Sequence, residues 1–168
     1  FISAFIIKTS IEILSEAALD LVGRNIDPEL AQKIKHKICT FPEVSGAYDL
    51  NLHNYGPTEF IGSVFIQVPD TLTAREIHRL TRDIAQEIFV KFGVILTIGI
   101  YAENSDTKAH QIMHSDLESI IAEYPEVVQM HGFYVDDARR VISFDLIIAF
   151  SCREQVKLKN RIVRAMRK

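Results

Sequence analysis

Hydrophobic residues recur at helical and strand spacings along the first half of the chain. Leu30, Ile34 and Ile38 recur every fourth residue after Asp27-Pro28, which predicts a capped helix with one buried stripe. The patterns that follow predict, in order, a strand, a second strand, a helix and a third strand at 47–52, 60–68, 73–88 and 94–101. A polar turn at 54–58 separates the first two strands, and the helix opens on a Thr73–Glu76 capping box.

The same order returns in the second half. The run Phe41-Pro-Glu-Val44 reappears as Tyr124-Pro-Glu-Val127, and similar elements surround both copies. The second copy predicts a helix opening at Ser115–Glu118, two strands joined by a turn, and a final helix, at 115–121, 128–135, 141–150 and 154–166. The turn is predicted at Asp136–Arg139, and no strand pattern follows the last helix.

Each copy therefore predicts helices on one face of a small antiparallel sheet. We expect an α+β protein made of two tandem ferredoxin-like modules of the metallochaperone type. The expected boundaries are 1–24 for an N-terminal helix, 25–104 for the first module and 105–168 for a second module that lacks its last strand.

The N-terminal segment is unusually apolar. Phe1–Ile7 carries no charge, and Lys8 is the first charged residue. A spanning helix needs about 20 apolar residues, and a signal peptide would begin with basic residues, so this run fits neither alone. Two interpretations remain: it is the cut end of a membrane helix, or residues Ser10–Val22 form an amphipathic helix that packs on its own domain.

Composition narrows the classes of function. The chain has 168 residues and a net charge of −3, which argues against nucleic acid as a partner. Cys39 and Cys152 have no metal-binding or redox spacing, which is typical of a reducing compartment. Phosphate-binding loops, nucleophile elbows and zinc-protease motifs do not occur, so we do not expect an enzyme.

The stretch from Ala18 to Asn104 resembles the cytoplasmic C-terminal domain of cation diffusion facilitator (cation efflux) transporters. The resemblance rests on four runs in the same order and spacing: Asp27-Pro-Glu-Leu30, Pro42–Leu50, Gly56–Ile61 and Ala74–His78. It implies a homodimer in the cell membrane that exports Zn²⁺ or a similar divalent cation, with this segment in the cytoplasm. It also implies that Phe1 to about Leu14 ends the last transmembrane helix, that the segment works with its own transmembrane domain, and that this region holds no cofactor.

The resemblance also implies a metal site in this domain, and here the chain departs from the family pattern. Tyr48, Phe65 and Gly99 stand where relatives carry histidines, and Tyr101 stands where an acid occurs. Only His78 is retained, and one imidazole cannot hold Zn²⁺, which takes three or four ligands. We therefore expect this site to be lost. His78 is kept as a candidate metal ligand, but the interpretation we favour is a surface or hydrogen-bonded histidine.

The second half contains another candidate for metal binding. His110 and His114 are four residues apart, a spacing that places two imidazoles on one helix face, and Asp106, Asp116 and His131 would supply further ligands. The interpretation we favour is a polar linker with solvent-exposed histidines. The last helix is rich in Lys and Arg, so it forms either a solvated face or a contact with anionic lipid headgroups.

These observations predict the cytoplasmic dimerisation and regulatory region of a zinc-type cation/proton antiporter. The alternative is a soluble tandem regulatory module that resembles ACT domains and binds a small ligand, because repeated α+β units suit both functions.

Overall fold

The computed structural model describes residues 2–22, 28–54, 60–104 and 108–166. The chain forms two compact units: the first comprises Phe1–Ile66 and Thr73–Gly99, and the second comprises Gln67–Leu72 and Ile100–Lys168. The protein is α+β, as predicted, with a ferredoxin-like arrangement of helices and sheets.

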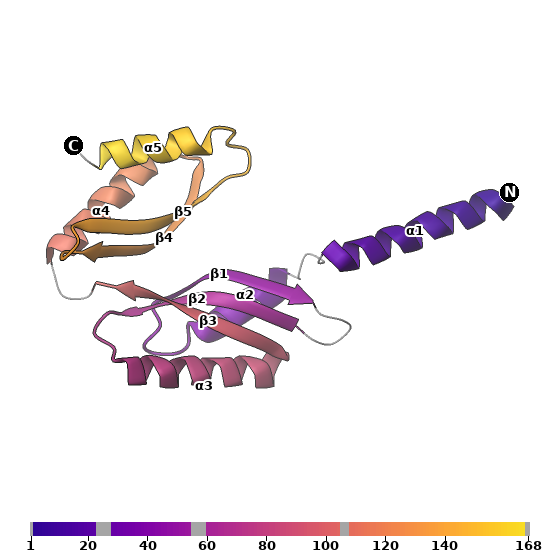
Figure 1. The fold of residues 1–168 in the computed structure, drawn as a ribbon, viewed down its shortest axis with the longest axis horizontal. Coiled ribbons are helices and arrows are strands. Elements are labelled where there is room, and N and C mark those ends of the chain that lie inside the picture. Colours follow the sequence, from indigo (N-terminus) through magenta and orange to yellow (C-terminus); the bar gives the residue numbers. More distant parts are fainter. Residues whose placement is uncertain (1, 23–27, 55–59, 105–107, 167–168) are drawn as a thin grey trace. The chain divides into compact units, whose positions relative to one another are not determined.

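The first unit is built around a three-stranded sheet. Its elements in chain order are α1 (Ile2–Val22), α2 (Pro28–Ile38), β1 (Gly46–Asn54), β2 (Phe60–Pro69), α3 (Ala74–Phe92) and β3 (Val94–Glu103). The strands lie in the order β1-β2-β3, and the ends of β2 and β3 belong to the second unit. Figure 1 shows α2 and α3 against this sheet. The order of elements after α1 matches the prediction.

The core of the first unit follows from the predicted apolar stripes. Fully buried residues come from α2, β2, α3 and β3: Ile34, Ile38, Val64, Ile66, Ile84, Ile88 and Val94. Because successive strand residues point to opposite faces, the even-numbered residues of β2 lie under the helices, and the odd-numbered ones lie on the other face. The predicted buried stripes of these elements are confirmed.

Local signals define both ends of α3. The Thr73 hydroxyl accepts a hydrogen bond from the backbone N–H of Glu76, and the Glu76 carboxylate accepts one from the Thr73 backbone N–H. This is the predicted capping box. At the other end Gly93 adopts a left-handed conformation (φ 67°), and its N–H donates to the carbonyl of Phe89.

Helix α1 is continuous from Ile2 to Val22. Its large apolar side chains are exposed as far as they are described: Ile2, Phe5, Ile6, Ile7, Ile11, Ile13 and Leu14. The side chains from Glu16 to Val22 lie outside the described residues, so packing of an amphipathic helix Ser10–Val22 on its own domain remains a prediction. Among the described residues, no helix is both long enough and apolar enough to span a membrane.

The second unit repeats the pattern with two strands. Its elements are α4 (Lys108–Ala122), β4 (Val127–Asp136), β5 (Val141–Ile148) and α5 (Gln155–Ala165). β4 and β5 pair antiparallel, and α4 and α5 lie on one side of this hairpin (Figure 1). Leu117, Leu158 and Ile162 form the buried centre, against the apolar faces of both strands.

The turn of this hairpin is the one predicted from Asp136–Arg139. The Asp136 carboxylate accepts a hydrogen bond from the Arg139 backbone N–H at 3.0 Å, and Arg140 takes a positive φ of 53°. Within β4 the register shifts between His131 and Tyr134, where Gly132 has a φ of 64°. A side chain at Gly132 would approach the ring of Tyr101 to 3.0 Å, so glycine fits both the bulge and the close packing.

One predicted helix start is wrong. We expected a capping box at Ser115–Glu118, but α4 already begins at Lys108 and places Ser115 in its interior. The stretch Lys108–His114 contains neither Gly nor Pro, so nothing in it breaks a helix. Because His110 in this stretch is buried like Leu117, the buried side of α4 extends two turns before Ser115. The predicted cap at Asp27, the loop at 55–59 and the candidate ligand Asp106 lie outside the described residues.

Candidate functional site

The first unit exposes an apolar sheet face. On the side away from α2 and α3, Ile61 and Phe65 of β2 and Ile95 of β3 are all more than a third exposed, Ile95 to 52%. Exposed large apolar residues on neighbouring strands are typical of interaction surfaces. We call this set the open face.

Phe65 and Gly99 meet on the open face. A Cβ built on Gly99 would overlap Cε1 of the Phe65 ring, so the ring covers the space above Gly99. These are two of the positions where the family resemblance implies histidine ligands. Neither residue supplies a donor atom, and a ring fills the space between them. The residues present therefore do not fit a metal ion at this place.

The retained histidine lies elsewhere in the unit. His78 is exposed on α3, whose buried residues Leu80 and Ile84 face the sheet from the side opposite Phe65. The structure therefore does not bring His78 to the open face. Its role as a metal ligand remains a prediction.

His110 is the most enclosed of the predicted ligands on α4. It is 8% exposed, and its Nε2 atom lies 3.0 Å from Oδ2 of Asp137, at the hairpin turn 27 residues away. Among the described residues its Nδ1 atom is buried without a hydrogen-bond partner. The expectation of a solvent-exposed linker is therefore wrong for His110, because the helix turns this side chain toward the hairpin.

His114 lies one turn further along α4 and has different neighbours. Its ring packs edge-on against Phe133 with centroids 4.9 Å apart, and its Nδ1 atom lies 3.7 Å from Oε1 of Glu118. The two histidines share a helix but contact different groups. In the described parts of the chain, no three His, Cys, Asp or Glu side chains gather closely enough to hold a metal ion.

A second buried histidine lies on β4. His131 is 4% exposed, and its ring is 5.4 Å from the Tyr101 ring, centroid to centroid, at 60°. Close by, the Asn104 side chain pairs with the backbone of Val135, accepting from its N–H at 2.7 Å and donating to its carbonyl at 3.2 Å. The Asn104 side chain thus makes the two hydrogen bonds that the backbone of a paired strand residue would make, and these bonds connect the end of β3 to β4. The sequence contains no signal for this pairing.

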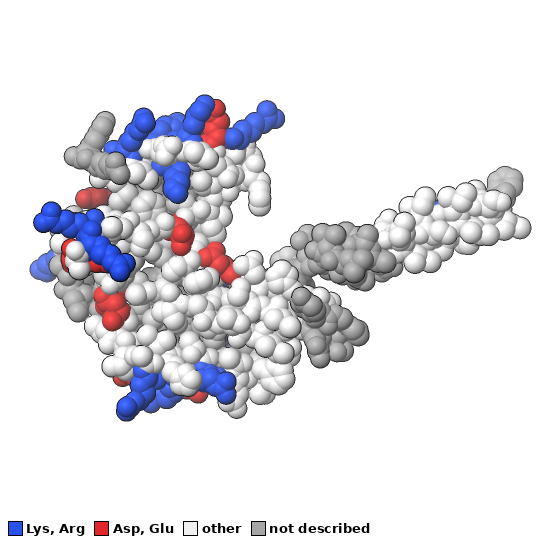
Figure 2. Space-filling view, viewed as in Figure 1, with Lys and Arg blue, Asp and Glu red and all other residues white. Residues whose placement is uncertain are grey.

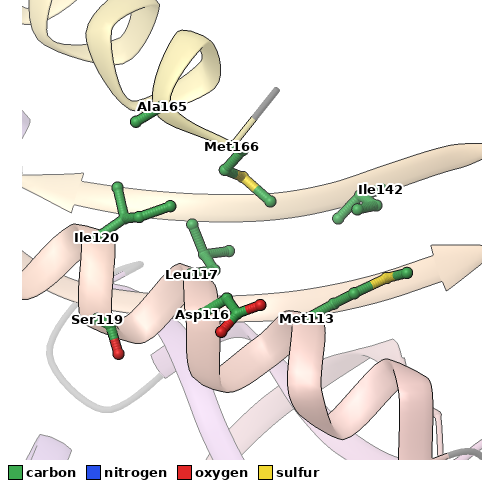
Figure 3. Close-up of a pocket in the computed structure, with 8 residues that line it drawn as sticks. All are labelled: Met113, Asp116, Leu117, Ser119, Ile120, Ile142, Ala165 and Met166. Atoms are coloured by element: carbon green, nitrogen blue, oxygen red, sulfur yellow. The ribbon is translucent and has the colours of Figure 1, made fainter. Parts of the chain in front are cut away.

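The second unit also contains an open cavity of about 510 Å³ between α4, β5 and α5. Figure 3 shows apolar side chains from all three elements around it, with the Asp116 carboxylate at one side. Its lining residues are Met113, Asp116, Leu117, Ser119, Ile120, Ile142, Ala165 and Met166. Asp116, which we considered as a metal ligand, therefore borders an apolar hollow.

The comparisons with known proteins decide the family. Residues 26–105 match the family model described as the cytoplasmic domain of cation efflux proteins. This part of the chain belongs to the cation efflux family. The family resemblance seen in the sequence is thereby confirmed.

Relatives with curated names agree with this family. The chain is 30% identical over 91 residues to the cation-efflux pump FieF of Escherichia coli O127:H6 and to that of Shigella boydii serotype 18. Each match covers 54% of this chain and 30% of the relative, so the chain spans less than a third of these pumps.

Solved structures of cation efflux domains are also similar. The metal-bound C-terminal domain of the CzcD transporter from Thermotoga maritima is 20% identical, with a TM-score of 0.42 over 44% of this chain and 87% of that one. The C-terminal domain of the magnetosome protein MamB from Desulfamplus magnetovallimortis is 15% identical, with a TM-score of 0.40. That match covers 48% of this chain and 98% of the MamB domain.

Proposed function

We propose that this chain is the cytoplasmic dimerisation and regulatory region of a membrane transporter that exports a divalent cation of the zinc type. Transport would be cation/proton antiport by the full-length homodimer, with the cation as substrate. The observation that carries the proposal is the family match over residues 26–105, together with the names of the FieF relatives.

The open face of the first unit supports the dimerisation role. Ile61, Phe65 and Ile95 leave apolar surface in water, and a second copy of the same face would cover it. A twofold interface is self-complementary, so one such patch on each copy is sufficient.

The dimer proposed here needs no metal ion at Phe65 and Gly99. Because the ring of Phe65 occupies the space above Gly99, apolar contact replaces ligand bonds at these positions. Regulation would then act through contacts with the membrane part or through the second unit, rather than through metal bound at this face.

Exposed apolar residues of α1 support attachment to a membrane part. Phe5, Ile7, Ile11 and Leu14 are in contact with water in the chain alone, which is unfavourable unless another apolar phase covers them. The transmembrane domain of the same protein would provide that phase.

Zinc content of cells tests the transport proposal. Cells that lack the gene should accumulate more Zn²⁺ than cells that carry it, and the whole gene should restore the lower level. Unchanged zinc, iron and manganese contents in both strains would contradict an export function.

A further inference from the structure

The second unit carries an exposed surface that the dimerisation role does not use. Between Phe150 and Met166 there are five Lys and Arg residues and one acid, whereas the whole chain has a net charge of −3. The basic residues are Arg153, Lys157, Lys159, Arg161 and Arg164, and all five are more than a third exposed. Figure 2 shows Lys and Arg side chains gathered over α5.

The basic residues surround the exposed side of α5. Leu158 and Ile162 are buried, so they define the inward side of the helix. At about 100° per residue, Lys157 and Arg164 lie roughly opposite them, and Lys159 and Arg161 flank the exposed side. Lys157 is paired with the carboxylate of Glu154, which leaves four basic residues in excess.

Apolar side chains accompany these charges. Phe150, in the loop before α5, is 103% exposed, and Val156, on the exposed side of α5, is 74% exposed. A solvated basic face would gain nothing from a fully exposed aromatic ring, whereas an interface between water and lipid accepts the ring and the charges together.

We propose that this surface, Phe150 together with the exposed side of α5, binds an anionic lipid bilayer. The basic side chains would contact lipid phosphates, while Phe150 and Val156 would enter the boundary between headgroups and acyl chains. Nucleic acid also offers phosphates, but it provides no apolar phase for Val156. The choice of lipid rests in part on the proposed function, which places this chain beside a membrane.

A tryptophan at position 150 tests the contact directly. The chain contains no Trp, so Phe150→Trp gives the full-length chain a single reporter at this surface. The vesicles are phosphatidylcholine alone, or phosphatidylcholine with roughly one third phosphatidylglycerol, a composition chosen because basic surfaces bind anionic lipid. Phe89→Trp, on the exposed side of α3, is the matched control.

With the anionic vesicles only, we expect the emission of the Phe150→Trp chain to shift to shorter wavelength and to be quenched by brominated acyl chains. The Phe89→Trp control should show neither effect. Exposed apolar residues of α1 can bring the chain to both kinds of vesicle, so the difference between the two compositions isolates the basic surface.

Charge neutralisation provides the second readout. Lys157→Gln with Arg164→Gln, in the Phe150→Trp chain, should lower the ratio of inserted to free reporter about 30-fold, because each well-placed basic residue contributes about fivefold. The matched pair Arg75→Gln with Arg82→Gln on α3 should leave this ratio unchanged.

An identical spectrum of the Phe150→Trp chain with neutral and anionic vesicles would overturn the proposal, and so would a response to DNA or heparin without one to vesicles. The test is separate from dimerisation. A dimer in solution whose reporter does not respond would refute the lipid contact alone, and a monomer whose reporter responds would refute the dimer alone.

Discussion

Phe65 determines what the open face of the first unit can bind. Its ring covers Gly99, and the two residues replace the ligands that the family resemblance implies. The sequence predicted this loss because the substitutions are visible in the motif. It could not predict that the ring would fill the space, since the contact depends on how β2 and β3 pair.

The contact predicts a coupled effect on stability. Gly99→Ala should lower the free energy of unfolding by about 1–3 kcal/mol, because the new methyl group must displace the Phe65 ring. In a Phe65→Ala chain, Gly99→Ala should lower the free energy of unfolding much less, because the ring that the methyl group would displace is absent. Urea denaturation of the four proteins gives the coupling energy, and strictly additive effects would contradict the contact.

His110 shows a different limit at the residue scale. Its spacing from His114 suggested a helix face with two ligands or an exposed linker, but its observed contact is with Asp137 in a distant turn. Sequence spacing describes neighbours along one helix, and it contains no information on which turn meets that helix.

His110 and His114 differ in burial, so we expect their substitutions to differ in their effect on the free energy of unfolding. His110→Ala should lower the free energy of unfolding by about 1–3 kcal/mol, because it removes a buried side chain and its contact with Asp137. His114→Ala, at a half-exposed position of the same helix, should have a smaller effect. Thermal denaturation followed by circular dichroism compares them, and equal effects would contradict the assigned burial.

At the scale of elements, the sequence was most informative where the signals are local. The Thr73 capping box and the apolar stripe of α3 lie within one stretch of chain, and both are confirmed. The start of α4 was missed because Ser115–Glu118 has the form of a capping box, while burial of residues before it depends on tertiary packing. Tertiary context overrode the local signal there.

The capping box predicts a change in stability with pH. The pKa of Glu76 lies below its usual 4.5, first because the Thr73 backbone N–H donates to the carboxylate and then because the Thr73 hydroxyl does. A lowered pKa in the folded state means that the unfolded chain takes up the proton first as the pH falls. The stabilisation is therefore complete above pH 4.5 and is lost as the pH falls through the folded-state pKa.

Glu76→Gln should therefore destabilise the first unit at neutral pH, and the difference from the parent chain should shrink toward acid pH. In a Thr73→Ala chain, which should itself lose about 1 kcal/mol of stability, Glu76→Gln should still destabilise the unit, but by less than in the parent chain, because the backbone N–H of residue 73 still donates to the carboxylate while the hydroxyl is gone. Urea denaturation at two pH values measures both. A difference that grows as the pH falls would contradict the capping role.

The end of α3 gives a prediction that depends on backbone conformation alone. A Cβ at Gly93 would contact nothing within 4 Å, yet the residue has a φ of 67°. Gly93→Ala should therefore cost about 1 kcal/mol through left-handed strain, and Gly93→Asn should cost less. Equal stability of all three proteins in thermal denaturation would contradict the observed cap.

At the scale of the molecule, the duplication predicted two α+β units, and the chain forms two compact units. The sequence could not assign the ends of β2 and β3 to the second unit, because that division depends on contacts such as the one between Asn104 and Val135. It also could not distinguish an exposed apolar face from a buried one, since both have the same alternating pattern.

The open face predicts where dimerisation can be disrupted. Ile95→Lys places a charge in the proposed contact and should weaken the dimer by at least about tenfold. Val90→Lys, at an exposed position of α3 outside that face, is the matched control and should leave the dimer intact. Light scattering over a range of protein concentrations compares the two variants with the parent chain.

Sedimentation equilibrium of the whole chain, with Zn²⁺ and separately with a chelator, tests the central claim most directly. The account predicts a mass of twice 19.1 kDa in both solutions, with the same dissociation constant, because Phe65 and Gly99 leave no metal ligands at their place on the open face. A mass of 19.1 kDa at high protein concentration, or a dimer that forms only with Zn²⁺, would contradict it.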